Sequence, residues 1–313
     1  MQHKVDVILL TYKPEKQVMR LIEVLEKQTY PVHKIIIMNT EEKYFQALFY
    51  GTGFMQRYKN IEVRHVSAKE FDHGGTRSKA TAYSNADIFI CMTHDAIPAD
   101  EYLVERLVQA LEQNKGAAAA YARQLPMPEC REIEKFTRSF NYPEATRIKS
   151  KEDLAELGIK TYFCSNVCAA YNRNIFDMMG GFEKKAIFNE DMIFAGHAVQ
   201  AGYKIVYAAE AKVFHSHNYT CMQQFQRNFD LGVSQADHPE VFAGISSQSE
   251  GVSLVKKTIG HLVDNKQKRL VPYLIVSSGC KYIGYQLGKH YKRLPYGIIL
   301  KCSSNKQYWK KRI

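Results

Sequence analysis

Asp87-Ile-Phe-Ile-Cys-Met-Thr-His-Asp95-Ala-Ile-Pro98 is the stretch of sequence around which the rest of the chain is organised. Its apolar part, residues 88–92, is typical of a buried strand in a parallel sheet, and we expect Pro98 to end the ladder of hydrogen bonds. Open α/β sheets bind ligands at the carboxyl ends of their strands. We therefore expect Asp95 to be a ligand for a divalent cation that holds a phosphate group. A turn aspartate that bonds its own backbone explains the same pattern, so the rest of the chain has to decide.

Apolar runs alternate with helical periodicity along most of the chain. Strands are predicted at residues 5–10, 34–38, 61–66, 88–92, 117–123 and 203–208, with a further apolar run at 162–171. Helices are predicted at 15–28, 41–50, 80–85, 173–179 and 192–201, and after an N-cap at Asp100. The polar residues 125–158 are predicted to form a functional loop or lid. This order predicts an α/β fold with a mostly parallel central sheet and flanking helices.

The composition limits the class of protein. The 313 residues include 43 Lys and Arg against 32 Asp and Glu, and the resulting net charge of +11 favours anionic partners. The 20 Tyr and 16 Phe residues argue against disorder. Because the seven cysteines include no CxxC pair, we expect reduced thiols in a cytoplasmic protein. We expect neither a signal peptide nor a membrane span, since Pro and Lys interrupt the most apolar stretch, residues 270–287.

Three further groups of residues are candidates for chemistry. Gly74 and Gly75 precede a predicted helix, so their backbone could approach an anion; a simple Gly-Gly turn explains them equally well. Glu190-Asp191 begins another helix, where a carboxylate can act as a general base or merely complement the helix dipole. His215 and His217 would lie on one side of an extended strand and can bind a metal, although such pairs are often ordinary surface residues.

The last quarter of the chain, residues 252–313, differs in character from the rest. Basic residues from Lys256 to Arg312 are interleaved with several Tyr residues and with Trp309. A basic, aromatic-rich helical segment suits a membrane interface. A helical tail that packs on the preceding domain and exposes a solvated basic face explains the same pattern. We therefore divide the chain into residues 1–251 and a C-terminal helical segment, residues 252–313.

Four motifs together resemble the family 2 inverting glycosyltransferases of the GT-A fold, in particular their rhamnosyltransferase-like branch. They are Thr11-Tyr-Lys-Pro14, Phe71-Asp-His-Gly-Gly-Thr-Arg77, Thr93-His-Asp-Ala-Ile-Pro98 and Gly180-Gly-Phe182 with Asn189-Glu-Asp191. The resemblance implies a GT-A catalytic domain over residues 1–251. It assigns the catalytic base to Asp191, beside Glu190, and a metal site to Asp95 together with His215 or His217. It assigns donor binding to Thr11, Tyr12, Asn39, Asp72, Gly74, Gly75, Arg77, His94 and Asp95.

The resemblance also implies an activity. A sugar, with rhamnose from dTDP-rhamnose as the first choice, would pass from a nucleotide-sugar donor to a saccharide or lipid-linked acceptor in bacterial surface polysaccharide synthesis. Mg²⁺ or Mn²⁺ is the implied cofactor, and the cytoplasmic protein would contact the anionic inner face of the cell membrane. The alternatives are a UDP-sugar donor, or nucleotide-sugar binding without turnover. Charge alone suggests a nucleic-acid-binding module, but no recognisable motif supports it, so we expect no nucleic acid partner.

Overall fold

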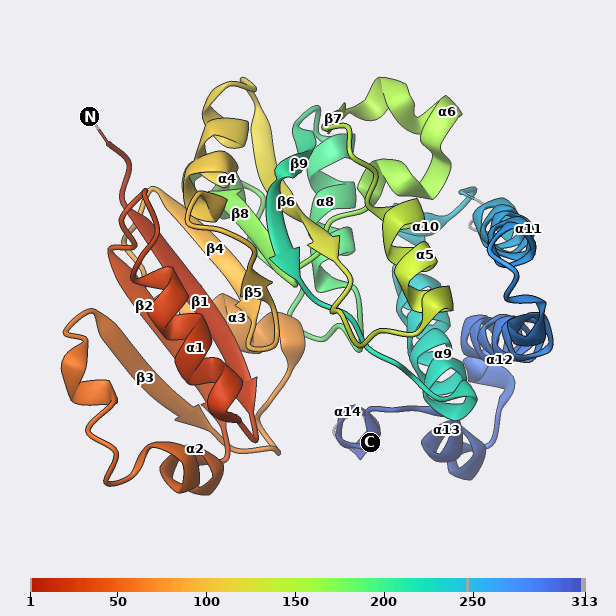
Figure 1. The fold of residues 1–313 in the computed structure, drawn as a ribbon, viewed down its shortest axis with the longest axis horizontal. Helices are drawn as coiled ribbons and strands as arrows, with labels where there is room; N and C mark the ends of the chain where they lie inside the picture. The colour runs from red at the N-terminus through yellow and green to blue at the C-terminus, as the bar shows by residue number, and fades with distance from the viewer. Residues whose placement is uncertain (1, 246–247, 311–313) are drawn as a thin grey trace.

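The computed structural model of the chain describes residues 2–245 and 248–310. Within these residues, nine strands form one sheet in the order β3-β2-β1-β4-β8-β6-β9-β5, and β7 pairs with β9 beside this path (Figure 1). They are β1 (Val5–Tyr12), β2 (Lys34–Thr40), β3 (Ile61–Val66), β4 (Ile88–Thr93), β5 (Ile97–Pro98), β6 (Ala117–Leu125), β7 (Arg147–Lys149), β8 (Cys168–Asn172) and β9 (Lys204–Phe214). Because only β5, β7 and β8 of these run against the others, the sheet is mostly parallel, as predicted.

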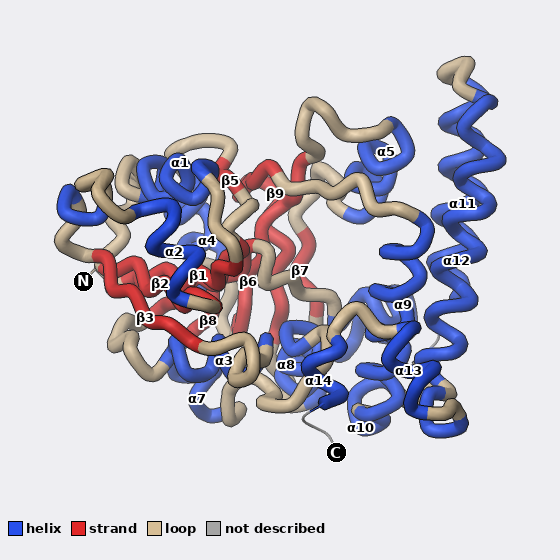
Figure 2. The backbone as a smooth tube through the Cα atoms, turned by 90° about the horizontal axis from the view of Figure 1, so that it is seen from below, coloured by secondary structure: helices blue, strands red, loops and turns tan. Residues whose placement is uncertain are grey.

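Helices cover both faces of the sheet, and a group of C-terminal helices lies beyond its β7 end (Figures 1 and 2). They are α1 (Lys16–Leu25), α2 (Glu42–Phe49), α3 (His73–Thr81), α4 (Leu103–Glu112), α5 (Glu132–Asn141), α6 (Leu154–Leu157), α7 (Arg173–Met178), α8 (Glu190–Gln200), α9 (Cys221–Asp237), α10 (Pro239–Phe242), α11 (Gln248–Asp264), α12 (Val271–Lys289), α13 (Tyr296–Cys302) and α14 (Lys306–Lys310). Helices α1, α2 and α4 pack on one face of the sheet, and α3, α7 and α8 pack on the other.

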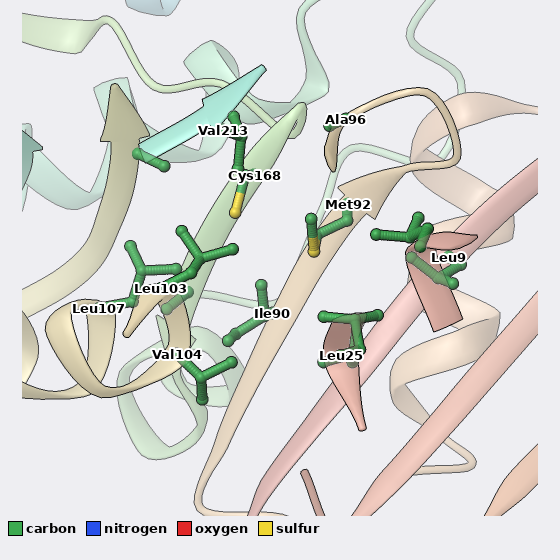
Figure 3. Packing of buried hydrophobic residues seen from close by; sticks show 14 of the residues in the cluster. Leu9, Leu25, Ile90, Met92, Ala96, Leu103, Val104, Leu107, Cys168 and Val213 are labelled. Atoms are coloured by element: carbon green, nitrogen blue, oxygen red, sulfur yellow. The ribbon is translucent and has the colours of Figure 1, made fainter. Parts of the chain in front are cut away.

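Strand β4 lies in the buried centre of the sheet, as its apolar run predicts. Ile90 and Met92 point towards α1 and α4, where they pack with Leu9 and Leu103 (Figure 3). Phe89 and Cys91 point to the opposite face of the sheet and belong to the cluster beneath α3, α7 and α8. Since both faces of a parallel sheet are covered, the strand is apolar at consecutive positions, and polar residues begin only where it leaves the core.

The predicted apolar faces of the first helices are confirmed, but one predicted cap is wrong. The residues of α1 that are buried are the four that the periodicity predicts: Val18, Leu21, Ile22 and Leu25. The predicted apolar residues of α4 are buried too. Its N-cap, however, is Tyr102, whose backbone N–H donates a hydrogen bond to the Asp100 carboxylate. Asp100 also forms an ion pair with Arg106, so it contacts the first turn of the helix although it is not the N-cap.

Three other predictions about local structure are wrong. Residues 125–158 are not one irregular loop, because they contain α5, β7 and α6. Pro98 does not stop the hydrogen bonding, because the backbone N–H of Ala99 still donates to the carbonyl oxygen of Lys212, one residue beyond the short antiparallel pair of β5 and β9. Helix α3 begins at His73 and ends at Thr81, so the glycine pair lies inside its first turn and not ahead of it. The predicted helix at residues 80–85 therefore begins about two turns too late.

The C-terminal helices pack against α9, and the closest contact is between α9 and α12. A Cβ atom on Gly284 would lie 2.2 Å from the carbonyl oxygen of Phe225, and one on Gly288 would lie 2.1 Å from that of Phe229. Glycine is therefore required at both positions for the two backbones to meet. Among the described helices, none combines the length and the apolar character that a membrane crossing needs. A domain boundary at residue 251 stays a prediction, and residues 311–313 of the segment lie outside the described part of the chain.

Candidate active site

Asp95, His215 and His217 form a compact cluster at the ends of two strands. Asp95 follows β4, and the two histidines follow β9, so the sheet brings them to the same edge. The Asp95 Oδ2 atom lies 3.1 Å from His217 Nε2 and 3.6 Å from His215 Nε2, and the two Nε2 atoms are 3.1 Å apart. One ligand atom from each residue lies within 4.8 Å of the others. One metal ion could therefore contact all three, whereas the resemblance left open which of the two histidines would take part.

Neighbouring groups hold His215 in the form that a metal ligand requires. Its Nδ1 atom lies 3.0 Å from Oε1 of Gln124, and the Gln124 amide nitrogen donates to Ser165 Oγ at 3.0 Å. Because the amide oxygen can only accept, Nδ1 carries the proton and the lone pair on Nε2 faces Asp95. Arg138 donates to the same amide oxygen and helps to fix its orientation.

The protonation states of the cluster also suit a cation. Burial by itself would raise the pKa of Asp95, but the adjacent imidazoles of His215 and His217 outweigh it and hold that pKa well below its ordinary value. Burial lowers the pKa of His215, although Asp95 opposes the shift. The carboxylate is therefore ionised and the buried imidazole is neutral, which are the forms that bind metal.

A second cluster of charged groups lies at the start of α8. Glu190 accepts a hydrogen bond from Arg77 of α3, and both side chains are buried, with exposures of 7% and 5%. The Asn166 side chain also donates to Glu190, at 3.1 Å. Asp191, the next residue, accepts hydrogen bonds of 2.8 Å from the backbone N–H groups of Asn166 and Met192. Adjacent carboxylates therefore have different partners.

These different partners separate the pKa values of the two acids. Burial would raise the pKa of Glu190, but Arg77 and His73 outweigh it, so Glu190 stays ionised. Burial and the nearby Glu190 charge raise the pKa of Asp191 to about 7, against the opposing hydrogen bonds from Asn166 and Met192. A carboxylate that titrates near neutral pH is suited to take up a proton.

One cavity connects the two clusters. Its volume is ≈ 280 Å³, and its lining includes His215 and His217 on one side and Asp191, Glu190 and Arg77 on the other. Arg227 of α9 also lines it, with its guanidinium 5.2 Å from the ring centre of Phe188. The structure therefore brings together the predicted base and the predicted metal ligands, although they are far apart in the sequence.

The predicted nucleotide residues lie at the ends of β1 and β2. Thr11 pairs with Asn39 in the sheet, and its hydroxyl donates to the Asn39 side-chain oxygen at 3.0 Å. Tyr12 is half exposed, and its ring meets that of Tyr44 edge to face at 5.6 Å. His94 lies next to Asp95 but turns away from the cluster, with its Nδ1 atom 3.1 Å from the carbonyl oxygen of Leu10.

The glycine motif lets α3 pack closely against a distant part of the chain. Asp72 is the N-cap of α3 and accepts the Gly75 backbone N–H at 2.6 Å. A Cβ atom on Gly74 would lie 1.8 Å from the carbonyl oxygen of Glu183. The glycines therefore let α3 approach residues 183–184, and this packing accounts for them without an anion. Asp72 and Gly75 line a separate hollow and not the cavity of Asp191, and their part in donor binding stays a prediction.

Arg77 lines the cavity of Asp191, and its Nη1 atom donates a hydrogen bond to Glu190 inside the core. Its part in donor binding stays a prediction. Gln124, Arg138, Asn166 and Arg227 line the cavity and were not predicted. Only Gln124 carried a signal in the sequence, because it lies at the carboxyl end of a predicted strand, where ligands bind.

Comparison with known proteins places the chain in a family. Residues 6–180, more than half of the chain, match the family described as Glycosyl transferase family 2. The chain belongs to glycosyl transferase family 2. It is 37% identical over 310 residues to the O-antigen chain rhamnosyltransferase RfbN of Salmonella typhimurium, covering 98% of this chain and 96% of the relative. It is 43% identical over 248 residues to the O-antigen chain rhamnosyltransferase WbaN of Salmonella anatum, covering 78% of each.

Solved structures show the same fold. The mannosyltransferase PcManGT from Pyrobaculum calidifontis, in complex with GDP-Man and Mn²⁺, aligns with a TM-score of 0.55 at 12% identity and covers 100% of this chain and 87% of its own. S. aureus TarS 1-349 in complex with UDP-GlcNAc aligns with a TM-score of 0.51 at 12% identity, and the alignment covers 93% of this chain and 91% of the TarS chain. The family 2 membership and the GT-A fold predicted from the motifs are confirmed, and the chain is a glycosyltransferase.

The first prediction for this family 2 transferase concerns Asp191. Asp191→Asn should lower kcat by about 10²–10⁴-fold, the usual effect of losing a general base, while donor affinity stays close to that of the wild type. Steady-state kinetics and donor titration measure both quantities. Asp177→Asn, an exposed acid on α7, is the matched control and should keep full activity. Turnover of the Asp191 variant within a few-fold of the wild type would contradict the assignment.

The same residue predicts a pH dependence. Only ionised Asp191 can take a proton, and its pKa is raised to about 7, so kcat/KM should fall as the pH drops below about 7. In the folded protein the pKa of Asp191 lies above the ordinary 3.8, so protonated Asp191 stabilises the folded state at pH values below 3.8. This contribution to the free energy of unfolding is lost as the pH rises through about 7. Glu190→Gln, which removes the neighbouring charge, should move the acid limb to lower pH. A value of kcat/KM that stays constant between about pH 5 and 8 would contradict the raised pKa of Asp191.

The second prediction concerns the metal ligands. His215→Ala should weaken Mn²⁺ binding by at least about tenfold, because one of three ligands is lost. Titration of the purified protein with Mn²⁺, followed by electron paramagnetic resonance, measures this without turnover. His197→Ala, a half-exposed histidine on α8, is the control. Equal affinities of the two variants, or full activity in excess chelator, would show that the cluster holds no essential metal.

Proposed function

We propose that the chain transfers rhamnose from a nucleotide-sugar donor, with dTDP-rhamnose as the first choice, to a saccharide acceptor in O-antigen synthesis. The observation that carries the proposal is the single cavity lined by Asp191 and by two residues of the Asp95-His215-His217 cluster. The donor and the pathway are supported by the two relatives, which are both O-antigen chain rhamnosyltransferases.

The arrangement suits an inverting transfer in one displacement. Asp191 would take the proton from an acceptor hydroxyl as the hydroxyl oxygen attacks the anomeric carbon, and the bond from that carbon to the nucleoside diphosphate would break. No covalent nucleophile is required. The backbone N–H groups of Asn166 and Met192 donate to the Asp191 carboxylate and hold it in one orientation, so that the proton can be taken without rotation of the side chain.

The leaving diphosphate needs positive charge close by. Asp95, His215 and His217 would hold Mn²⁺ or Mg²⁺, and two imidazoles favour Mn²⁺ over Mg²⁺. Bound there, the cation would stabilise the negative charge that develops on the diphosphate. Arg227 supplies a second cation, because it lines the cavity, stacks on the rings of Phe188 and Tyr219, and forms no ion pair among the described residues. Its loss should lower kcat more than donor affinity.

A panel of nucleotide sugars tests this function. With Mn²⁺ present, dTDP-rhamnose should support sugar transfer to oligosaccharides that end in a free hydroxyl at the growing end, as judged by mass spectrometry of the products. Transfer from a UDP-sugar in place of dTDP-rhamnose would support the other family 2 donor class. If the donor binds but no sugar is transferred or released, the protein binds nucleotide sugars without turnover.

A second proposal concerns the membrane. We infer that α11 and α12 form a docking surface for anionic lipid, defined by the exposed residues Val252, Lys256, Val263, Lys268, Arg269, Ile275, Val276, Tyr282 and Ile283. Positions 275, 276, 282 and 283 share one side of α12, since a helix repeats every 3.6 residues. The two helices lie side by side at the outer end of the molecule (Figure 2). Apolar side chains among basic ones suit a headgroup layer, where each engaged basic residue contributes about 1 kcal/mol.

Charge reversal tests the docking surface better than deletion does, because removing α12 would uncover the glycine-lined contact on α9. Lys256→Glu, Lys268→Glu and Arg269→Glu together should weaken sedimentation with anionic liposomes by at least about tenfold at low salt. Lys59→Glu, Lys69→Glu and Lys115→Glu, which are exposed in the catalytic part, make the same change of net charge and form the control. Equal losses in both triple variants would mean that net charge and not this surface binds the lipid.

A further inference from the structure

A larger cavity adjoins the one that holds Asp191. Its volume is ≈ 610 Å³, and residues of α5, β7, β9 and α12 line it. Arg138, Tyr142, Phe163 and Tyr219 line both cavities, so the two spaces share one wall. A molecule held in the larger cavity would therefore lie next to the base and the metal ligands. Neither the proposed donor chemistry nor the docking surface uses this space.

Six aromatic residues line the larger cavity. They are Tyr121, Phe140, Tyr142, Phe163, Tyr207 and Tyr219. Hydroxyl and amide groups of Thr137, Asn141 and Thr146 lie between them. Sugar rings present apolar C–H faces and polar edges, so an aromatic wall with a few fixed polar groups suits them. This lining indicates a saccharide.

The cavity also carries excess positive charge. Five cations line it against a single acid, Glu134. Three of the cations are neutralised: Arg138 pairs with Glu134, Arg147 with Asp153 and Glu156, and Lys160 with Glu250. The other two, Lys149 and Lys281, have no carboxylate partner among the described residues.

The two remaining lysines differ in their surroundings. Lys149 is buried, and its ammonium donates to the Tyr121 hydroxyl and to two backbone carbonyl oxygens. Lys281 makes neither a hydrogen bond nor an ion pair within the described residues, although it is half-buried and α12 directs it into the cavity. Burial lowers its pKa, and Glu134 only partly opposes this. A half-buried ammonium without a partner leaves room for an anion from outside the chain.

We propose that the larger cavity binds the acceptor saccharide and that Lys281 selects an acceptor that carries an anionic group, either a phosphate or a sugar carboxylate. The proposal rests on the proposed function, because it places the acceptor next to Asp191. The sugar would pack on the aromatic wall, and the anion would receive hydrogen bonds from the Lys281 ammonium. The phosphate could belong to a lipid-linked diphosphate, and the carboxylate to an acidic sugar unit.

Binding measurements with matched probes test the proposal on the full chain. The probes are the 1-phosphates, the uronic acids and the neutral methyl glycosides of glucose, galactose and mannose, titrated calorimetrically. Excess chelator keeps the metal cluster empty, so the probes are not retained by a metal ion there. For at least one sugar, the anionic form should bind about 10- to 100-fold more tightly than the methyl glycoside, as expected for a hydrogen bond to a charged group. Preference for the 1-phosphate indicates a phosphate-linked acceptor, and preference for the uronic acid indicates an acidic sugar.

Three variants assign the preference to Lys281. Lys281→Gln should reduce it to near onefold, and Lys281→Arg should retain it, which separates charge from a general effect on folding. Lys289→Gln removes one exposed charge from the same helix and should change nothing. If Lys281→Gln keeps the preference, or if no sugar shows one in the wild type, the proposal is wrong. These readouts need no donor, so a failure of rhamnose transfer would overturn the proposed function and leave them intact.

Discussion

The ion pair between Arg77 and Glu190 is the contact on which the rest of the site depends. It joins α3 to the first turn of α8 inside the core, where transferring two charges from water is costly unless further hydrogen bonds compensate. Asn166 supplies one of them, and it also donates to Asp191. Removing either charge would leave the other buried alone, at a cost of about 3–5 kcal/mol. The pair needs α3 to lie close to residues 183–184, and only glycine at position 74 permits that approach.

The same ion pair gives the two adjacent acids, Glu190 and Asp191, different pKa values. Glu190 keeps its charge because Arg77 and His73 lie beside it, and that charge makes it harder for Asp191 to ionise. Two carboxylates in one helical turn thus have pKa values on opposite sides of their ordinary range, which is how an active site obtains a base that works near neutral pH.

The sequence predicted what local patterns determine. Strand β4 and the buried face of α1 follow from apolar periodicity, and Asp95 follows from the rule that ligands bind where strands end. The two histidines were singled out by their alternate spacing. The role of Gly74 depends on Glu183, far along the chain, and no local pattern contains that contact. The sequence predicts a loop over α5, although Ile133, Phe136 and Phe140 recur at helical spacing, because polar residues and the prolines on either side of the helix obscure this short pattern. Lys281 could not be placed either, because its environment comes from α5 and β7 as much as from its own helix.

The C-terminal helices connect the chemistry to the surface of the protein. On α12, positions 277, 281, 284 and 288 recur every three or four residues and face inward: the glycines meet α9 and Lys281 enters the larger cavity. Positions 275, 276, 282 and 283 lie on the opposite, exposed side. One rigid helix therefore sets the distance between the proposed docking surface and the proposed acceptor cavity. If the outer face of α12 binds lipid, the membrane and Lys281 are separated by the width of α12, about 10 Å. An acceptor with its phosphate near the membrane surface would then have to extend only over that distance to contact Lys281.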